Sequence, residues 1–385
     1  MKQYRELTYE ELAFHLEDSL AFRSFSRMKM GQYPSGSTLQ ENIKAIQAET
    51  WEVVNRVLLG YAAQQNLEKG RTVRMDSTVV ETHVHHPTDS TLLVDGIRVI
   101  TRLLQAGKAL NPMPWYTWVD HQRAAKKRAL QILNARKDKV RLKAYRGLLS
   151  LARQVQGYAL QAIAELKGFV GANLEDTIAA HKVLDQLEKA VSLLKRVLDQ
   201  TERRVIRGEK VPAGEKVVSF FECHTDVIVK GSRDTQYGHK VFLSGGRSGL
   251  ILDCVIARGN PNDAALFPDL LTRQEAIYGR LPRKTAADGG FAYLDNLRLA
   301  KGQGVKDVMF AKKRGLGVLD MVKSLWVYKK LRNFRAGIEA NISRLKRAFC
   351  LDRCNWQGWP GFRQYVWSAV VSYNVLVLWI LLQAQ

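Results

Sequence analysis

Cysteine and proline are scarce in this chain of 385 residues, which contains four cysteines and nine prolines. So few cysteines exclude a disulfide-stapled scaffold and are typical of a protein kept in a reducing cytoplasm. So few prolines exclude a fibrous or proline-rich class. The charged N-terminal segment lacks the apolar run of a secretory signal. With 46% hydrophobic and 25% charged residues, the chain is predicted to form two or three globular domains.

Acidic residues are also fewer than basic ones. The chain has 37 Asp and Glu and 59 Lys and Arg, which gives a formal net charge of +22. An excess of this size indicates a polyanionic partner, and nucleic acid is favoured over an anionic membrane. The excess is uneven along the chain. Residues 1–70 and 71–91 each carry a net charge of −1, whereas residues 92–210 and 211–385 each carry +12.

Two runs hold most of the basic side chains. Residues 123–146 contain ten basic residues and one acidic residue, and residues 301–347 contain thirteen and three. Either run alone is also compatible with a solvated helix surface. Two runs in one chain favour a basic surface large enough to bind a DNA duplex. Such a surface contacts the phosphates of the DNA. In the first run we predict DNA contacts from Arg123, Lys126, Lys127 and Arg128.

An all-helical N-terminal domain is predicted over residues 1–70. Apolar residues recur at helical spacing over residues 7–26, and residues 49–65 form a third helix. The second helix is expected to begin at Ser37, because Ser37 and Gln40 have the spacing of a capping box. A break rich in Gly, Pro and Ser separates the first two helices. This pattern is equally compatible with a DNA-binding helix-turn-helix and with a small bundle.

The pattern then changes twice. Residues 73–80 are rich in β-branched side chains and are predicted to form a strand. Residues 92–210 are helical again and are predicted to be an inserted domain. The helical stripe in that insertion is typical of an antiparallel helical core, and its members are Leu184, Leu187, Val191, Leu194 and Leu198.

Strand signals resume after the insertion. The predicted hairpin turn at Gly245–Gly249 has the sequence GGRSG and separates two short apolar runs. The order of elements predicts an α/β fold with a mixed sheet built from residues 71–91 and 211–349. The helical domain of residues 92–210 is inserted between these two parts. The expected strands are 226–230, 240–244, 250–257, 284–287 and 307–310, and the expected helices are 263–277, 293–301 and 334–349.

The most apolar stretch of the chain is residues 366–382. Its length is at the lower limit for a membrane-spanning helix, and it contains Ser368, Ser372 and Asn374. We prefer a C-terminal helix, within residues 350–385, that is buried against the sheet. A membrane span is the alternative.

Three carboxylates lie where a metal-dependent enzyme would use them. Asp76 lies within an apolar strand, Asp288 ends a short buried strand before two glycines, and Glu339 lies on a predicted helix. Each has a structural alternative, as a turn cap, a helix start or the i,i+4 partner of Arg335. Together they are hard oxygen ligands suited to two Mg²⁺ or Mn²⁺ ions, which can promote phosphodiester cleavage. We predict that these three residues are both catalytic residues and metal ligands, with Asp226 as a reserve candidate for Asp76.

Basic side chains accompany these acids. Arg335, Glu339 and Lys346 share one narrow stripe of their helix, so Arg335 and Lys346 are predicted to contact DNA phosphates. His239 and Lys240 begin a strand near the expected centre of the sheet, and we predict DNA contacts for them too.

Two possible zinc sites are less favoured. His83, His85 and His86 are close in sequence, but their spacing matches no common zinc site. They are better interpreted as polar or DNA-facing residues. Cys350 and Cys354 lack a second pair of ligands.

Four blocks of sequence resemble bacterial insertion-sequence transposases, and the nearest group is ISNCY. They are RMDSTVVETHVHHPTDSTLLVDGIRVITR, YGHKVFLSGGRSGLILDCVIARGNPNDAALF, AADGGFAYLDNL and FRAGIEANISRLKRAF. The resemblance implies an RNase H-like sheet with helices on both faces and a DDE triad at Asp76, Asp288 and Glu339. Related transposases carry a Tyr-x2-Arg-x3-Glu-x6-Lys signature. Arg335, Glu339 and Lys346 fit it, but Arg332 stands at the tyrosine position.

The resemblance implies a DNA transposase that cuts transposon terminal inverted repeats and joins them to target DNA. Such enzymes act as homodimers or larger assemblies, here expected in the bacterial cytoplasm at the nucleoid and without a membrane. The alternative is a transposase-derived repressor or architectural protein that binds DNA without cutting it. A membrane-anchored basic protein is a third interpretation, which rests only on the apolar C-terminal stretch.

Overall fold

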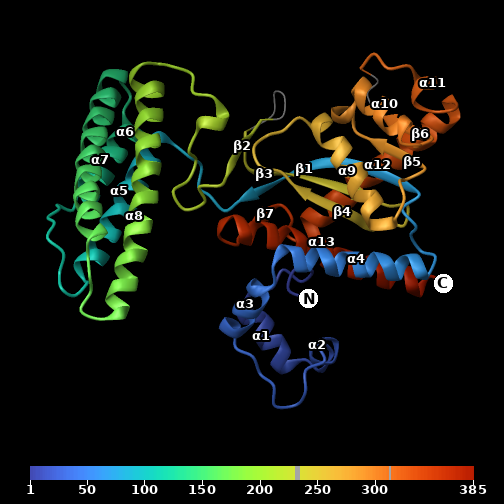
Figure 1. Cartoon of the computed structure of the whole chain (residues 1–385), viewed down its shortest axis with the longest axis horizontal. Helices are drawn as coiled ribbons and strands as arrows, with labels where there is room; N and C mark the ends of the chain where they lie inside the picture. The colour runs from blue at the N-terminus through green and yellow to red at the C-terminus, as the bar shows by residue number, and fades with distance from the viewer. Residues whose placement is uncertain (230–234, 312–313) are drawn as a thin grey trace. The chain divides into compact units, whose positions relative to one another are not determined.

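The computed structural model describes residues 1–229, 235–311 and 314–385. The chain forms two compact units (Figure 1), and each is described by itself. Unit 1 comprises residues 1–83 and 228–385, and unit 2 comprises residues 84–227. The predicted helical insertion, residues 92–210, lies within unit 2.

A seven-stranded mixed sheet is formed by the described residues, with the order β2-β3-β1-β5-β6. In addition, β4 pairs with β3 and β7 pairs with β1. The central strand β1 is antiparallel to β3 and parallel to β5, and β5 is parallel to β6. The strands are β1 (Thr72–Thr82), β2 (Asp226–Ile228), β3 (Gln236–Gly245), β4 (Ile251–Ile256), β5 (Lys284–Ala287), β6 (Asp307–Phe310) and β7 (Arg353–Cys354).

These strands agree with the predicted ones, except that β7 was not predicted and Lys230 lies outside the described residues. The turn at Gly245–Gly249 joins β3 to β4 as a hairpin, in which Gly245 pairs with Ile251. Gly249 has a φ of +90°, a conformation that glycine adopts without a steric penalty.

Helices cover both faces of the sheet, because successive side chains of a strand point to opposite sides. From β1, Arg74 contacts α12 (Leu325–Ala348), whereas Ser77 contacts the first residue of α9 (Asp263–Tyr278). The α9 face is closed by an aromatic cluster of Phe242, Phe267 and Phe291. The mixed α/β fold, consistent with an RNase H-like sheet, is therefore confirmed. Two further helices are α10 (Leu294–Gly302) and α11 (Val318–Met321).

Four helices precede the sheet: α1 (Tyr9–Asp18), α2 (Leu20–Phe25), α3 (Gly36–Ala45) and α4 (Ala48–Gln64). Two details of the prediction were wrong. The expected helix over residues 7–26 is broken at Ser19, whose side chain caps α2. Ser35, and not Ser37, caps α3, since Ser35 Oγ accepts a hydrogen bond from the Thr38 amide. The interpretation of these helices as a DNA-binding domain stays a prediction.

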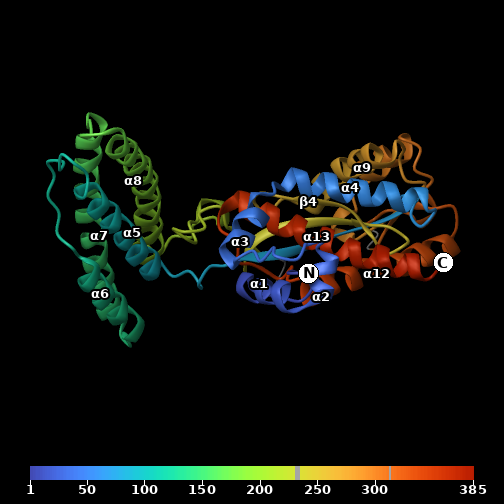
Figure 2. The ribbon, with the colours of Figure 1, turned by 90° about the horizontal axis from the view of Figure 1, so that it is seen from below.

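The apolar C-terminal stretch forms α13 (Gly358–Gln383), which lies beside α4 (Figure 2). Within the described residues, α13 alone is long and apolar enough to cross a membrane, and 61% of its most apolar window is buried. Its polar residues have partners inside the protein. Asn374 bonds both the amide and the carbonyl of Ile251 on β4, and Ser368 accepts a hydrogen bond from Gln3. These contacts favour the buried-helix prediction.

Unit 2 consists mainly of four helices: α5 (Asp89–Lys108), α6 (Gln122–Asn134), α7 (Asp138–Lys167) and α8 (Leu174–Thr201). Their apolar faces form a core separate from that of unit 1. The predicted stripe on α8 belongs to this core: Leu187, Leu194 and Leu198 are buried, and Leu184 and Val191 pack against them. The prediction that this stripe belongs to a helical core is therefore confirmed.

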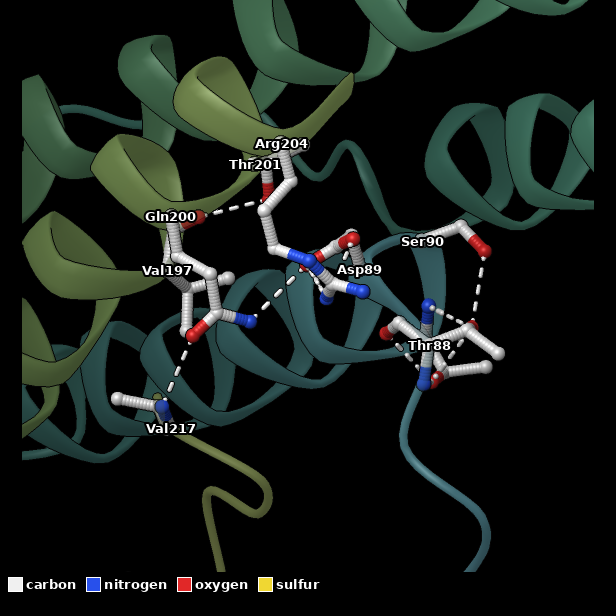
Figure 3. A network of polar contacts seen from close by, with 9 residues as sticks. Thr88, Asp89, Ser90, Val197, Gln200, Thr201, Arg204 and Val217 are labelled. Atoms are coloured by element: carbon white, nitrogen blue, oxygen red, sulfur yellow. Dashed lines mark hydrogen bonds and ion pairs between the residues drawn. The ribbon is translucent and has the colours of Figure 1, made fainter. Parts of the chain in front are cut away.

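A polar network joins the start and the end of the helical bundle (Figure 3). Asp89 begins α5 and accepts hydrogen bonds from Arg204 (3.0 Å) and from Gln200 (2.9 Å). The amide oxygen of Gln200 accepts a 2.9 Å bond from the Val217 amide, on the returning chain. The first helix, the last helix and the exit segment of unit 2 are thus connected by buried hydrogen bonds.

Candidate active site

Asp76 lies in the middle of β1, the central strand of the sheet. It has the same strand parity as Arg74, so its side chain is directed toward the α12 face. One carboxylate oxygen, Oδ1, accepts a 2.7 Å hydrogen bond from the Ser77 amide. The side chain is only 15% exposed. A mostly buried carboxylate on a central strand requires a compensating charge or ligand.

Asp288 follows β5, which lies parallel to β1 with Ala287 paired to Met75. The backbone amide of Asp288 donates a 3.3 Å hydrogen bond to the Met75 carbonyl. Asp76 and Asp288 therefore follow paired residues on adjacent parallel strands. The turn Gly289–Phe291 continues the chain, and the Asp288 side chain remains 41% exposed.

Glu339 comes from α12, which crosses the sheet and contacts β1, β5 and β6. Its helix begins at Leu325, nine residues before the predicted start, because Ser324 provides an N-cap for the Val327 amide. Ile338 and Leu345 are buried on the core-facing side, and Glu339 lies at the edge with 59% of its side chain exposed.

Arg335 brings the three carboxylates together. Its Nη1 lies 3.0 Å from Asp288 Oδ1 and 3.4 Å from Asp76 Oδ2, and its Nη2 donates to Glu339 Oε1. The Arg335 side chain is only 14% exposed. Two strand aspartates and one helix glutamate, all predicted from the sequence, thus meet at a single guanidinium. Their catalytic role stays a prediction.

The donor chemistry of this group fits a divalent cation, since three carboxylates carry a formal charge of −3 against +1 on Arg335. As the side chains stand, no set of three His, Cys, Asp or Glu side chains in the described ranges converges on a common metal position. In this arrangement the guanidinium of Arg335 contacts all three carboxylates. Asp76, Asp288 and Glu339 are the residues that would hold a metal here.

A second polar cluster adjoins the first on the other face of β1, and sequence reasoning missed its central residue, Asp263. The carboxylate of Asp263 lies 2.6 Å from Lys240 Nζ and accepts a 3.2 Å hydrogen bond from Ser77 Oγ. A Cβ on Gly290 would collide with this carboxylate, so the glycine permits the close approach. The available signal was the GNPND segment, where Asn262 caps α9 and places Asp263 at its first position.

The structure does not support direct DNA contacts from His239 and Lys240. His239 is fully buried, with its ring against Trp359 and Phe362. Lys240 is 7% exposed and directs its Nζ to Asp263 and to the Pro261 carbonyl. The two residues lie within β3 and not at its exposed start, so their burial disfavours the predicted DNA contacts.

The other predicted site residues lie as follows. Lys346 is on α12 and bonds Asp352 at 3.0 Å, and Arg332 is exposed on the same helix. The four basic residues at 123 and 126–128 are all exposed on α6 in unit 2. Asp226 begins β2. His85 Nε2 lies 3.5 Å from Asp95 Oδ2 within unit 2.

Arg74 supports the site from the same face of β1. It donates to the Phe334 carbonyl (3.2 Å) and to Asn341 Oδ1 (3.0 Å), which holds α12 against the sheet. Burial lowers the pKa of Arg74 from its ordinary value.

Comparison with known proteins adds one family. Residues 230–375 match the family model described as a transposase DDE domain. The matched range includes Asp288 and Glu339, whereas Asp76 and unit 2 precede it. No curated protein and no solved structure matches the chain. The family implies an enzyme of the transposase or nuclease type that acts on DNA, so the sheet, the three carboxylates and this match together support a DDE transposase.

Proposed function

We propose that the chain is a bacterial DNA transposase that cleaves the terminal inverted repeats of its element and transfers the cut strands into target DNA. Its nearest relatives would be the ISNCY group. The observation that carries the proposal is the convergence of Asp76, Asp288 and Glu339, from three separate elements, around Arg335.

In this proposal the three carboxylates hold two Mg²⁺ or Mn²⁺ ions. When bound, such ions activate the attacking hydroxyl and stabilise the leaving oxygen of a phosphodiester. Asp76 on β1 and Asp288 directly after the neighbouring strand β5 would bind both ions. Glu339 completes it from α12. Arg335 and Lys346 neutralise phosphates beside the scissile bond, because they lie on the same helix stripe as Glu339.

The substrate proposed is double-stranded DNA, bound by a homodimer or larger assembly at the nucleoid of the bacterial cytoplasm. The positive charge of unit 2 supports this partner. Arg123, Lys126, Lys127 and Arg128 are exposed on α6 without an acidic residue in that helix. They would contact phosphates and contribute affinity without sequence specificity.

The test is Asp76→Asn in a cleavage assay with a supercoiled plasmid that carries the DNA flanking the coding region. We expect metal-dependent cleavage to fall more than about 100-fold, because even the loss of an outer partner of a metal ligand costs 10–100-fold. Duplex binding should persist. Glu81→Gln, which neutralises another carboxylate of β1, is the matched control and should cut normally. Undiminished cleavage by Asp76→Asn would falsify the assignment.

The second candidate is a transposase-derived protein that binds DNA without cutting it. It is favoured only by the basic surface, which binding alone would explain. The clustered carboxylates disfavour it, since a DNA-binding surface gains nothing from a formal charge of −3. Tight duplex binding by the wild type without cleavage in Mg²⁺ or Mn²⁺ would establish this alternative.

A further inference from the structure

We propose that Arg335 is an internal counter-ion of the carboxylate cluster, which withdraws when a divalent cation binds and is thereby released toward the DNA phosphates. Metal loading and DNA binding would then be coupled through one side chain. This inference rests on the proposed function and adds a form of regulation at the same site.

The contacts of Arg335 resemble those required of a bridging cation. One nitrogen, Nη1, lies between Asp76 Oδ2 and Asp288 Oδ1, and the other, Nη2, contacts Glu339. Asp76, Asp288 and Glu339 are also the residues that would hold a metal ion. A guanidinium can satisfy several carboxylate oxygens at once because its donors form a rigid planar fork. Arg335 therefore occupies the position at which the three carboxylates meet.

Arg335 and a metal ion compete for these carboxylates, because an oxygen that bonds the guanidinium binds a metal ion less strongly. Within the described ranges the acidic side chains do not form a ready three-ligand site while Arg335 lies among them. Withdrawal of Arg335 exposes the carboxylates of both aspartates. It has a free-energy cost, because the guanidinium loses its three ion pairs. The cost is offset when a divalent charge replaces the monovalent one. Metal affinity should thus be limited by the stability of the Arg335 contacts.

A withdrawn Arg335 has a defined alternative partner. It lies on α12 near the edge that carries Glu339 and Lys346, where the proposed function places the DNA phosphates. Guanidinium groups pair with phosphate in the same bidentate geometry as with carboxylate. Arg335 can therefore exchange one kind of anion for the other by a side-chain movement. Because such coupling is reciprocal, DNA that captures Arg335 should also strengthen metal binding.

The experiment measures Mn²⁺ affinity of the full-length protein by isothermal titration calorimetry, without DNA. Arg335→Gln should bind Mn²⁺ about 10-fold more tightly than wild type, within the range typical of coupled sites. Arg332→Gln is the matched control, because it removes the same charge from the same helix at an exposed position. It should change affinity less than about threefold, since solvated charges are screened.

Folding is checked by circular dichroism. If Arg335→Gln does not fold, Arg335→Lys replaces it, because an ammonium cannot bridge three carboxylates as a fork does. It should tighten Mn²⁺ binding to a smaller extent. In a second measurement, by fluorescence anisotropy, Mn²⁺ should strengthen duplex binding more for wild type than for Arg335→Gln.

The outcomes separate the two proposals. If the wild type binds Mn²⁺ through Asp76 but the Arg335 variant binds it equally or more weakly, the counter-ion inference is wrong and the proposed function stands. If Arg332→Gln tightens binding as much as Arg335→Gln, general electrostatics explains the effect and the inference is again wrong. If neither wild type nor variant binds Mn²⁺, both the inference and the metal-dependent function fail.

Discussion

At the scale of single residues, Asp263 connects the candidate site to the opposite face of the sheet. Its ion pair with Lys240 is mostly buried, with 15% and 8% of the two side chains exposed. The same carboxylate accepts a hydrogen bond from the Ser77 hydroxyl. The backbone amide of Ser77 in turn donates to Asp76. Asp263 thus acts on Asp76 through one intervening residue, and we interpret it as a positioning residue.

Asp263→Asn should lower both stability and cleavage. The change leaves the buried Lys240 without its counter-charge, and breaking such a pair costs about 3 kcal/mol. Urea unfolding measures this loss. Cleavage should fall about tenfold at saturating metal because Ser77 no longer orients Asp76, while duplex affinity stays unchanged. Asp269→Asn, at an exposed position of the same helix, is the control. A loss of stability with normal cleavage would make Asp263 purely structural.

At the scale of elements, α13 shows why an apolar helix can belong to a folded domain. Asn374 is fully buried, and its amide satisfies both backbone groups of Ile251 at the outer strand β4. It also donates to Asn55 of α4. Buried backbone groups that lack partners are costly, so this one side chain closes the edge of the sheet in place of a further strand.

Asn374→Leu should destabilise unit 1 by about 2–3 kcal/mol, because the Ile251 amide and carbonyl lose their partners. Thermal or urea unfolding of the full chain gives the number. Val375→Ala, at the next and partly exposed position of α13, should change stability by no more than about 0.5 kcal/mol. If α13 were instead a membrane helix, Asn374→Leu would leave the soluble fold unaffected and increase partition into vesicles.

At the scale of the whole molecule, the net charge differs between helices of the same unit. α6 contains four basic residues and no acidic one, whereas α8 contains acidic side chains beside its basic ones. Locally balanced charge gives little attraction to a polyanion. The +22 of the chain therefore overstates the surface available to DNA, and α6 is the best-defined part of that surface in unit 2.

Replacing Arg123, Lys126, Lys127 and Arg128 together with glutamine should weaken duplex binding and reduce its dependence on salt. Each lost phosphate contact lowers the slope of log K against log salt by about 0.9, so the slope should fall by up to about 3.6. Fluorescence anisotropy across a salt series measures this. The matched control replaces Lys182, Lys189, Lys195 and Arg196 of α8, which removes the same total charge. Equal slopes for both variants would refute the role of α6.

Local sequence signals predicted the elements of the fold well. The β-branched run of β1, the hairpin glycines and the helical stripe of α8 each correspond to the element observed. Boundaries were less accurate, since Ser35 rather than Ser37 caps α3 and α12 begins at Leu325. Capping depends on the conformation of one residue, and several neighbouring serines satisfy the same pattern.

By itself, the sequence determined the periodicities, the uneven charge and the three carboxylates, because these are properties of residue type and spacing. Only the tertiary structure decided which carboxylates share a partner, that Arg335 is that partner, and that Asp263 joins Lys240. It also decided that His239 is buried. A pattern along the chain specifies which face of an element is apolar, but not which other element covers it. The residues that meet here come from β1, β3, α9, α12 and the turn after β5, which are far apart in sequence. The packing of those elements sets the contacts between them.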